Sequence, residues 1–298
     1  MRYISITYEN KNGVLRFDRD HLHILAISGL GTPQKVYTSH EYVGYDGAFT
    51  DGEKKSSRAI TLKFDFPENQ YEIRKIMRVL DIGGTLKLQC GKIRRKITVN
   101  QVSVSEPEDK YAIRVFTIQF KCDSPFFNDY NDTEKACFDV AGGIVEWNLG
   151  TEGNPIVWGR LIHDCIITNG GDYPIEPTFI INVMGNSSDN STLSILKVND
   201  SYTSDDADEA NVLQKISFTH TFKSGEEITV NLNGRDDNGR YIRSSIDGNI
   251  SHKRDSGISL SKFKLDTGDN RIVVKHDIED ASVSVRIIYN NNYAEAVY

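Results

Sequence analysis

The chain has 298 residues, of which 38% are hydrophobic and 26% charged, and its mean hydropathy is -0.43. This composition is typical of a globular protein with room for two domains of ordinary size. No stretch approaches the roughly 18 consecutive apolar residues that a membrane span needs. The first residues lack an apolar stretch behind a basic start, so we expect no secretory leader, no membrane insertion and folding in a cytosol.

The charge is divided unevenly along the chain. Residues 1–130 carry a net charge of +4, from 20 Lys and Arg against 16 Asp and Glu, and residues 131–298 carry -11, from 15 against 26. This asymmetry predicts two regions with different surroundings. The densest basic run, Lys92–Lys96, is short. We interpret it as a solvated strand face, because a phosphate-binding stripe needs more charge or interleaved aromatic residues.

Short strands with a period of two dominate the chain. In Phe116–Cys122 four apolar residues alternate with three polar ones, and successive side chains of a strand point to opposite faces, so this segment is predicted as a half-buried strand. The same alternation predicts strands at Ile60–Phe66, Thr85–Cys90, Ile97–Val104, Thr178–Met184, Leu193–Val198, Ile228–Leu232, Arg271–Lys275 and Val283–Tyr289. Many short strands of this kind favour β-sandwiches or barrels.

One segment, Glu68–Leu80, has the period of an amphipathic helix. Its apolar residues stand at i, i+3, i+4 and i+7 and are Ile73, Ile76, Met77 and Leu80. Pro67 suits the first helical turn, and Gly83 and Gly84 suit the far end, where a left-handed residue commonly stops a helix. The first region, residues 1–130, is therefore predicted as a β-sandwich with one packed α-helix at about 68–80.

Residues 131–159 have the character of a connection between domains, with one candidate strand at Ile144–Leu149. The second domain, 160–298, is predicted as strands almost throughout, with two long polar loops, Asn199–Asn211 and Arg235–Asp255. Trp147 and Trp158 lie near the connection. They are interpreted as packing anchors between domains, the alternative being a platform on which a sugar ring stacks.

The sequence lacks the motifs of common enzymes. There is no GxSxG nucleophile elbow, no GxxxxGK[ST] phosphate loop and no HExxH zinc pair. The four cysteines, Cys90, Cys122, Cys137 and Cys165, are far apart and without a CxxC pair, so they are predicted as buried free thiols. We therefore expect no enzyme, no catalytic residue and no cofactor.

Three groups of residues are candidate metal sites. His21 and His23 would share a strand face, but no Cys or carboxylate stands near them at ligand spacing. The acidic loop Ser204–Glu209 could attract calcium but lacks the glycine and the terminal glutamate of an EF-hand loop. Asp236–Gly239 ends in Asn-Gly, which is a hairpin turn signal by itself. We expect solvated loops and no metal.

Several stretches together resemble the distal tail protein family of long-tailed bacteriophages. The stretches that carry the resemblance, in the order of the family, are Gly44-Tyr45-Asp46-Gly47 with Arg58–Phe64, Phe116–Phe127 with its Ser-Pro-Phe-Phe ending, Asn169–Thr178, and Phe263–Val274 followed by Val283–Tyr289 and Tyr293. Each stretch is weak alone, but together they span nearly the whole chain.

The resemblance implies a fold and a role. Residues 1–130 would form a tail-tube-like domain, six copies of which close into a ring, and residues 160–298 a galectin-like β-sandwich. The ring would lie at the virion tail tip, assembled in the bacterial host cytoplasm, between the major tail tube protein and the tail-associated tip protein. In some relatives it also holds receptor-binding proteins. Genomic DNA would pass through the channel without specific binding.

The long segment Glu41–Ser57 has few apolar residues and is predicted as a loop that orders against a neighbouring subunit or ring. Other functions stay open at this point. A carbohydrate-binding or host-receptor-binding module is the main alternative, kept in view by Tyr241, Tyr289 and Tyr293. A cell-wall hydrolase and another tube component of a virion or secretion system are the others. An infectious phage, a defective prophage and a phage-derived bacteriocin are all compatible with the sequence.

Overall fold

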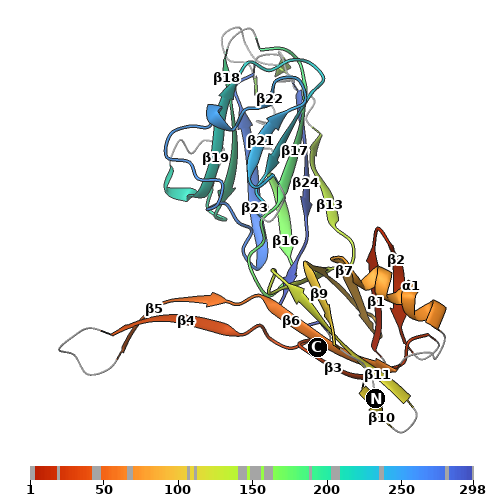
Figure 1. The fold of residues 1–298 in the computed structure, drawn as a ribbon. Helices are drawn as coiled ribbons and strands as arrows, with labels where there is room; N and C mark the ends of the chain where they lie inside the picture. The colour runs from red at the N-terminus through yellow and green to blue at the C-terminus, as the bar shows by residue number, and fades with distance from the viewer. Residues whose placement is uncertain are drawn as a thin grey trace. The chain divides into compact units, whose positions relative to one another are not determined.

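The computed structural model describes residues 4–18, 21–41, 48–65, 70–105, 108–110, 113–139, 146–147, 156–157, 164–187, 190–202, 209–234, 238–278 and 282–296. Antiparallel strands make up most of these residues, and they contain one α-helix (Figure 1). The predicted mainly-β class is confirmed. Within the described ranges, no helix has both the length and the apolar character that a membrane crossing requires.

The chain divides into two compact units. Unit 1 comprises Met1–Asn131 together with Asn292–Tyr298, and unit 2 comprises Asp132–Asn291. Unit 2 is thus an insertion near the end of unit 1. The predicted second domain, 160–298, included the closing residues that the structure assigns to unit 1. Part of the predicted connection 131–159 forms a strand of unit 2, β13 (Thr133–Asp139).

Unit 1 contains two larger antiparallel sheets. The first has the order β2-β1-β7-β8-β12-β25, with β1 at Ile4–Asn10, β2 at Gly13–Phe17, β7 at Gly84–Cys90, β8 at Ile93–Val99, β12 at Phe127–Asp129 and β25 at Asn292–Tyr293. The second has the order β10-β11-β6-β3, and β9 also pairs with β11. Its strands are β3 at Ile24–Ser28, β6 at Arg58–Asp65, β9 at Gln101–Val104, β10 at Glu108–Lys110 and β11 at Ile113–Cys122.

The two sheets of unit 1 enclose one core, and helix α1 (Gln70–Leu80) packs against it. Ile76 and Leu80 are buried in this core, while Ile73 and Met77 are partly buried against it, so the predicted helical stripe is confirmed. Aromatic rings fill the centre of the core, with Phe64 lying 5.3 Å from Phe17 and 6.0 Å from Phe116 between ring centroids.

The predicted strand Ile97–Val104 is two strands. Asn100 separates β8, which pairs with β7 in one sheet, from β9, which pairs with β11 in the other. Its backbone N–H donates to Lys121 O at 2.9 Å, and its side-chain oxygen accepts from Asp123 N at 2.9 Å. Asn100 therefore carries the chain from one layer of the sandwich to the other.

Gly83 and Gly84 do follow the helix, but the reason predicted for them is wrong. Neither glycine has a positive φ. A Cβ on Gly83 would lie 2.6 Å from Val99 O, and one on Gly84 would lie 2.3 Å from Glu9 O. The glycines are needed because neighbouring backbone approaches too closely for any side chain.

The predicted loop Glu41–Ser57 is largely a β-hairpin. Strand β4 (Lys35–Glu41) pairs with β5 (Ala48–Lys55) in a two-stranded sheet of its own. We name residues 35–55 the arm, and residues 29–34 with 56–57, which join it to β3 and β6, the arm root. The arm continues the pairing of β3 with β6 as a ribbon (Figure 1). The prediction failed because the arm lacks the alternation of apolar and polar residues that marks a half-buried strand.

Unit 2 is a sandwich of two antiparallel sheets with one large core and a smaller apolar cluster of Leu196, Val198, Tyr202 and Val273. One sheet has the order β13-β24-β17-β20-β21-β22, with β17 at Thr178–Met184, β20 at Glu226–Asn231, β21 at Tyr241–Ser244, β22 at Gly248–Asn249 and β24 at Ser282–Tyr289. The other has the order β16-β23-β18-β19, with β16 at Asp164–Asn169, β18 at Ser191–Val198, β19 at Val212–His220 and β23 at Gly268–His276. A separate pair joins β14 (Glu146–Trp147) to β15 (Ile156–Val157), inside the predicted connection.

The two long loops predicted for unit 2 contain ordered structure. Arg235–Asp255 includes β21, β22 and a 3-10 turn at Ser251–Lys253, so its description as a loop is wrong. The predicted Asn-Gly hairpin turn before β21 is supported by Gly239, whose φ is 66°. Asn199–Asn211 is tied at its base, where Asn199 N donates to Asn211 O at 3.1 Å, and it ends in a 3-10 turn at Glu209–Asn211.

Candidate functional site

The guanidinium of Arg58, the first residue of β6, joins three separate segments of unit 1. Nε donates to Pro125 O at 2.9 Å, and Nη1 donates to Gly29 O at 2.7 Å and to Gly31 O at 2.5 Å. Nη2 donates to Ala294 O at 2.7 Å. Only 6% of this residue is exposed. A planar guanidinium with N–H groups fixed in several directions can hold such separate acceptors, which a lysine could not.

The aromatic end of the second resembling stretch lies at the same place. The ring of Phe127 stacks under the Arg58 guanidinium, with 4.4 Å between the guanidinium carbon and the ring centroid. The ammonium of Lys55 lies 5.6 Å from the ring of Phe126. Strands β6 and β11 also pair in register from Arg58↔Cys122 to Asp65↔Val115. Two stretches that each resemble the family, Arg58–Phe64 and Phe116–Phe127, are therefore adjacent in the structure. We give the name Arg58 node to Arg58, the Phe127 ring and the residues whose carbonyl groups Arg58 binds, which are Gly29, Gly31, Pro125 and Ala294.

The arm that begins beside this node is exposed on both faces. Every described side chain from Lys35 to His40 is exposed, including the large apolar side chains of Val36 and Tyr37. A two-stranded hairpin is only marginally stable alone in water. The arm therefore presents backbone edges and apolar side chains that a partner surface could cover.

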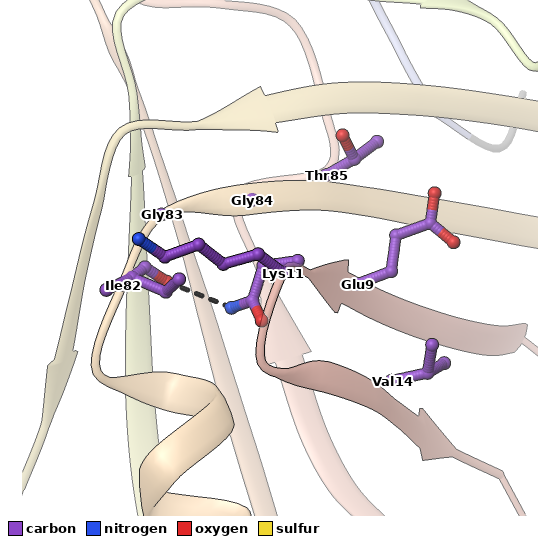
Figure 2. Close-up of a pocket in the computed structure, with 8 residues that line it drawn as sticks. Glu9, Lys11, Val14, Ile82, Gly83, Gly84 and Thr85 are labelled. Carbon is purple, nitrogen blue, oxygen red and sulfur yellow. Dashed lines mark hydrogen bonds between the residues drawn. The ribbon is translucent and has the colours of Figure 1, made fainter.

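A second feature of unit 1 is an open hollow of about 690 Å³ beside the β1–β2 turn (Figure 2). In Figure 2 the Lys11 side chain extends across it toward Ile82 and Gly83, and Glu9 and Thr85 lie at its other side. Glu9 is already paired with Lys87, whose pKa it raises through a hydrogen bond. With that carboxylate engaged, the lining offers no general acid and base aimed at a common point, so we assign the hollow no chemistry.

In unit 2, the carboxylate of Glu176 gathers two cations and a backbone donor. Oε1 accepts from Arg240 Nη2 at 2.8 Å and lies 3.4 Å from Lys264 Nζ, and Oε2 accepts from Gly234 N at 3.1 Å. Burial opposes ionisation, but these hydrogen bonds and charges outweigh it and lower the pKa of Glu176. Next to it, Ile175 and Leu265 exchange backbone hydrogen bonds of 2.9 Å. The stretches Asn169–Thr178 and Phe263–Val274 thus also meet in space.

Sequence reasoning missed a buried polar network in unit 2. His220 and Glu226 are fully buried, with His220 Nε2 lying 2.9 Å from Glu226 Oε1 and 3.5 Å from Asp247 Oδ2. Lys253 Nζ lies 2.7 Å from His220 Nδ1. An ammonium can only donate, so Nδ1 accepts and the ring proton lies on Nε2, facing Glu226. Nothing in the sequence marks this network, because its members stand in different strands and turns.

The network does not fit a metal site or a hydrolytic triad. A metal ion would need an unprotonated Nε2, but this nitrogen carries the ring proton, since Lys253 donates to Nδ1. The Asp247 carboxylate is already paired with Lys223. Ser244 Oγ donates a hydrogen bond to Glu226 Oε1, the same oxygen that accepts the hydrogen bond from His220 Nε2. The imidazole therefore does not activate this hydroxyl. Ser244 is also buried. The arrangement is a structural hydrogen-bond network.

The histidines weighed as a metal pair bind different carboxylates. His21 Nδ1 lies 2.7 Å from Asp18 Oδ1, and His23 Nδ1 lies 3.3 Å from Asp65 Oδ2. Several positions singled out in the sequence lie outside the described residues: 204–208, Asp236, Asp237, Gly44–Gly47, Pro67 and Trp158. The side chain of Trp147 is also not described. For these positions the expectations from the sequence stay predictions.

The three tyrosines that kept a sugar-binding role in view do not lie together. Tyr289 is buried in the core of unit 2. Tyr293 belongs to unit 1, where the Arg95 guanidinium covers its ring at 3.4 Å. Tyr241 is partly exposed on β21, with the Arg243 guanidinium 5.7 Å from its ring. Of these three tyrosines, Tyr241 is thus the one whose ring could stack on a sugar.

The side chains of three of the four cysteines are described, and all three are free and buried, as predicted: Cys90, Cys122 and Cys165. Burial raises the pKa of the Cys122 thiol to about 12, against the lowering effect of Arg58. This thiol is therefore protonated and unreactive at neutral pH.

The fold that holds these sites is a pair of antiparallel β units, the second inserted near the end of the first. No family model and no curated protein matches the sequence. Among solved structures, the Dit protein of phage SPP1 shares this fold over 97% of this chain and 98% of its own, with a TM-score of 0.64 and 12% identity. It is described as a paradigm of the hub adsorption apparatus in phages that infect Gram-positive bacteria.

Chains of the phage p2 baseplate in its activated conformation, solved with calcium and with strontium, match more distantly. They cover 96% of this chain and 98% of their own, with TM-scores of 0.44 and 0.45 and 14% identity. The resemblance inferred from the sequence is therefore confirmed at the level of the fold, by the SPP1 protein.

Proposed function

We propose that this protein is a structural hub of a phage tail tip, a distal tail or baseplate protein without enzymatic activity. The observation that carries the proposal is the shared fold with the SPP1 Dit protein over nearly the whole of both chains. The same relation was inferred from stretches spread along the sequence, and in the structure those stretches meet in pairs, at the Arg58 node and beside Glu176.

In this proposal six copies close into a ring through unit 1. Identical subunits that meet through different surfaces close into a ring when the rotation between them fits. Strands β2 and β3 are edge strands of the unit 1 sheets, and the arm is a sheet of only two strands. Such edges attract other chains unless they are covered. A neighbouring copy or ring that covers the arm would supply the burial that the hairpin lacks by itself.

The ring would join the major tail tube protein to the tail-associated tip protein at the virion tail tip. Genomic DNA would pass through its channel without specific binding. Unit 2, as a galectin-like sandwich, would lie outside the ring and hold receptor-binding proteins where these are present. Assembly would take place in the cytoplasm of the bacterial host.

The arm provides the test. A variant in which residues 36–54 are replaced by an Asn-Gly turn should keep the folded units, checked by circular dichroism, and should lose the ring. The mass of both proteins is compared by light scattering, and their particles by negative-stain microscopy. Rings of equal size from both proteins would contradict a role of the arm in assembly. Discrete sugar binding on a glycan array by a strictly monomeric protein would favour the sugar-binding alternative.

A further inference from the structure

We propose that Arg58 is a positioning residue that locks the arm root to the last residues of the chain, and so sets the direction of the arm. We name Asn292–Ala296 the closing segment. The consequence for ring formation rests on the proposed function, but the locking itself is a property of one isolated chain.

The first observation is the pattern of acceptors around Arg58. Nη1 donates to Gly29 O and Gly31 O, which both belong to the arm root, while Nη2 donates to Ala294 O in the closing segment. A single rigid, planar group thus holds both segments, and neither can move without breaking charge-assisted hydrogen bonds. The Phe127 ring beneath the guanidinium and the Pro125 carbonyl fix its plane.

The second observation is a direct bond between the same two segments. Ala296 N donates to Leu30 O at 3.1 Å, and both residues are buried in the core of unit 1. The closing segment is itself held in place, because β25 pairs with β12 and Tyr293 Oη donates to Asp129 Oδ1 at 3.0 Å. The arm root is therefore clamped on one side by β6 and on the other by the closing segment.

The third observation is that these contacts are made at the arm root, where the arm begins. Beyond the root, the described residues of the arm form a sheet of two strands, and the side chains of Lys35–His40 are exposed on both faces. The root also carries a hydrogen bond from Ser56 N to Gln34 O of 2.9 Å, which closes the ribbon just before the arm begins. Because the described strands of the arm pair with each other and with no third strand, the geometry at the root sets the direction of the arm.

The closing segment follows unit 2 directly in the chain. A change that displaces Ala294 or Ala296 would therefore release the arm root as well. The Arg58 node therefore links the closing segment, which follows unit 2 in the chain, to the root of the arm. The arm is the surface that we propose contacts a second copy.

The test measures the direction of the arm in the monomer. Spin labels are placed at Tyr37→Cys on the arm and at Thr98→Cys, an exposed position of β8, and their distance distribution is recorded by pulsed electron resonance in dilute solution. The unaltered background should give one narrow peak. Arg58→Met and Arg58→Lys should lose it and give a broad distribution. Arg94→Met, which removes an exposed arginine of β8, is the matched control and should keep the narrow peak.

A chain ended after Glu295 gives a second route to the same state, because it removes the Ala296 N–H without touching Arg58. It should also broaden the distribution, and circular dichroism should show that the units stay folded. A narrow peak in the Arg58 variants and in the shortened chain, or a broad one in the unaltered background, would overturn the proposal. Absence of a ring, measured separately by light scattering, would instead count against the proposed function.

Discussion

Glu176 shows how one partly buried carboxylate can organise a surface turn. It binds Arg240, Lys264 and the backbone of Gly234, which belong to the turn before β21 and to the segment before β23. Gly234 lies against the Arg240 guanidinium, where a Cβ would be only 2.5 Å from its central carbon. The carboxylate, the glycine and the arginine therefore pack together at one point of the turn.

The substitution Glu176→Gln should lower the free energy of unfolding by about 1 kcal/mol at neutral pH, because hydrogen bonds to a charged group are lost at a partly exposed site. The folded pKa of Glu176 is lowered, so its stabilisation is fully present above the unfolded pKa of about 4.3 and is lost as the pH falls through the folded value. Urea unfolding of both proteins from pH 7 down to pH 3 should show the gap closing below about pH 4. A gap that stays constant over this range would contradict the assignment.

At the residue scale, the sequence predicted types of residue better than their partners. The buried thiols were foreseen, because free cysteines behave as small hydrophobic residues. Arg58 stood out through a family resemblance, but no pattern shows that its guanidinium binds carbonyl groups in three distant segments. The His220 network gave no signal, since hydrogen-bond partners far apart in sequence cannot be deduced without the fold.

At the scale of elements, strand periodicity was a dependable guide wherever one face of a strand is buried. Predicted strands such as Phe116–Cys122 and Thr178–Met184 lie within observed ones. Periodicity gave a wrong prediction in two places. The arm is exposed on both faces, and Ile97–Val104 keeps its alternation although Asn100 moves the chain to the other sheet.

The glycines after the helix offer a test at this scale. Gly83→Ala and Gly84→Ala should each lower the free energy of unfolding of unit 1 by about 1–3 kcal/mol, because the added Cβ meets a backbone oxygen that cannot move freely. Gly31→Ala is the matched control, since nothing lies within 4 Å of its added Cβ and its φ is not positive. Chemical denaturation should leave this control within about 0.5 kcal/mol of the unaltered protein. Equal effects at all three positions would contradict the close approach of the backbone.

At the scale of the whole molecule, the charge asymmetry and the change of character near residue 131 indicated two regions, and the structure contains two units. The return of the closing residues to unit 1 was not predicted, because β25 is a strand of two residues and carries no periodicity. The insertion gives unit 2 two covalent links to unit 1, and its second link ends at the Arg58 node. Unit 1 has a core of its own, so a different second unit could be inserted at this point of the chain without a change in that core.

The proposed role as a structural hub requires that this protein assembles from several copies. The most direct measurement is the mass of the purified, unaltered protein in solution by light scattering at several concentrations. We expect a particle of six times 33.6 kDa, about 200 kDa, that appears as a ring in negative-stain images. A particle of 33.6 kDa at every concentration, which also forms no ring in the presence of tail tubes, would contradict it.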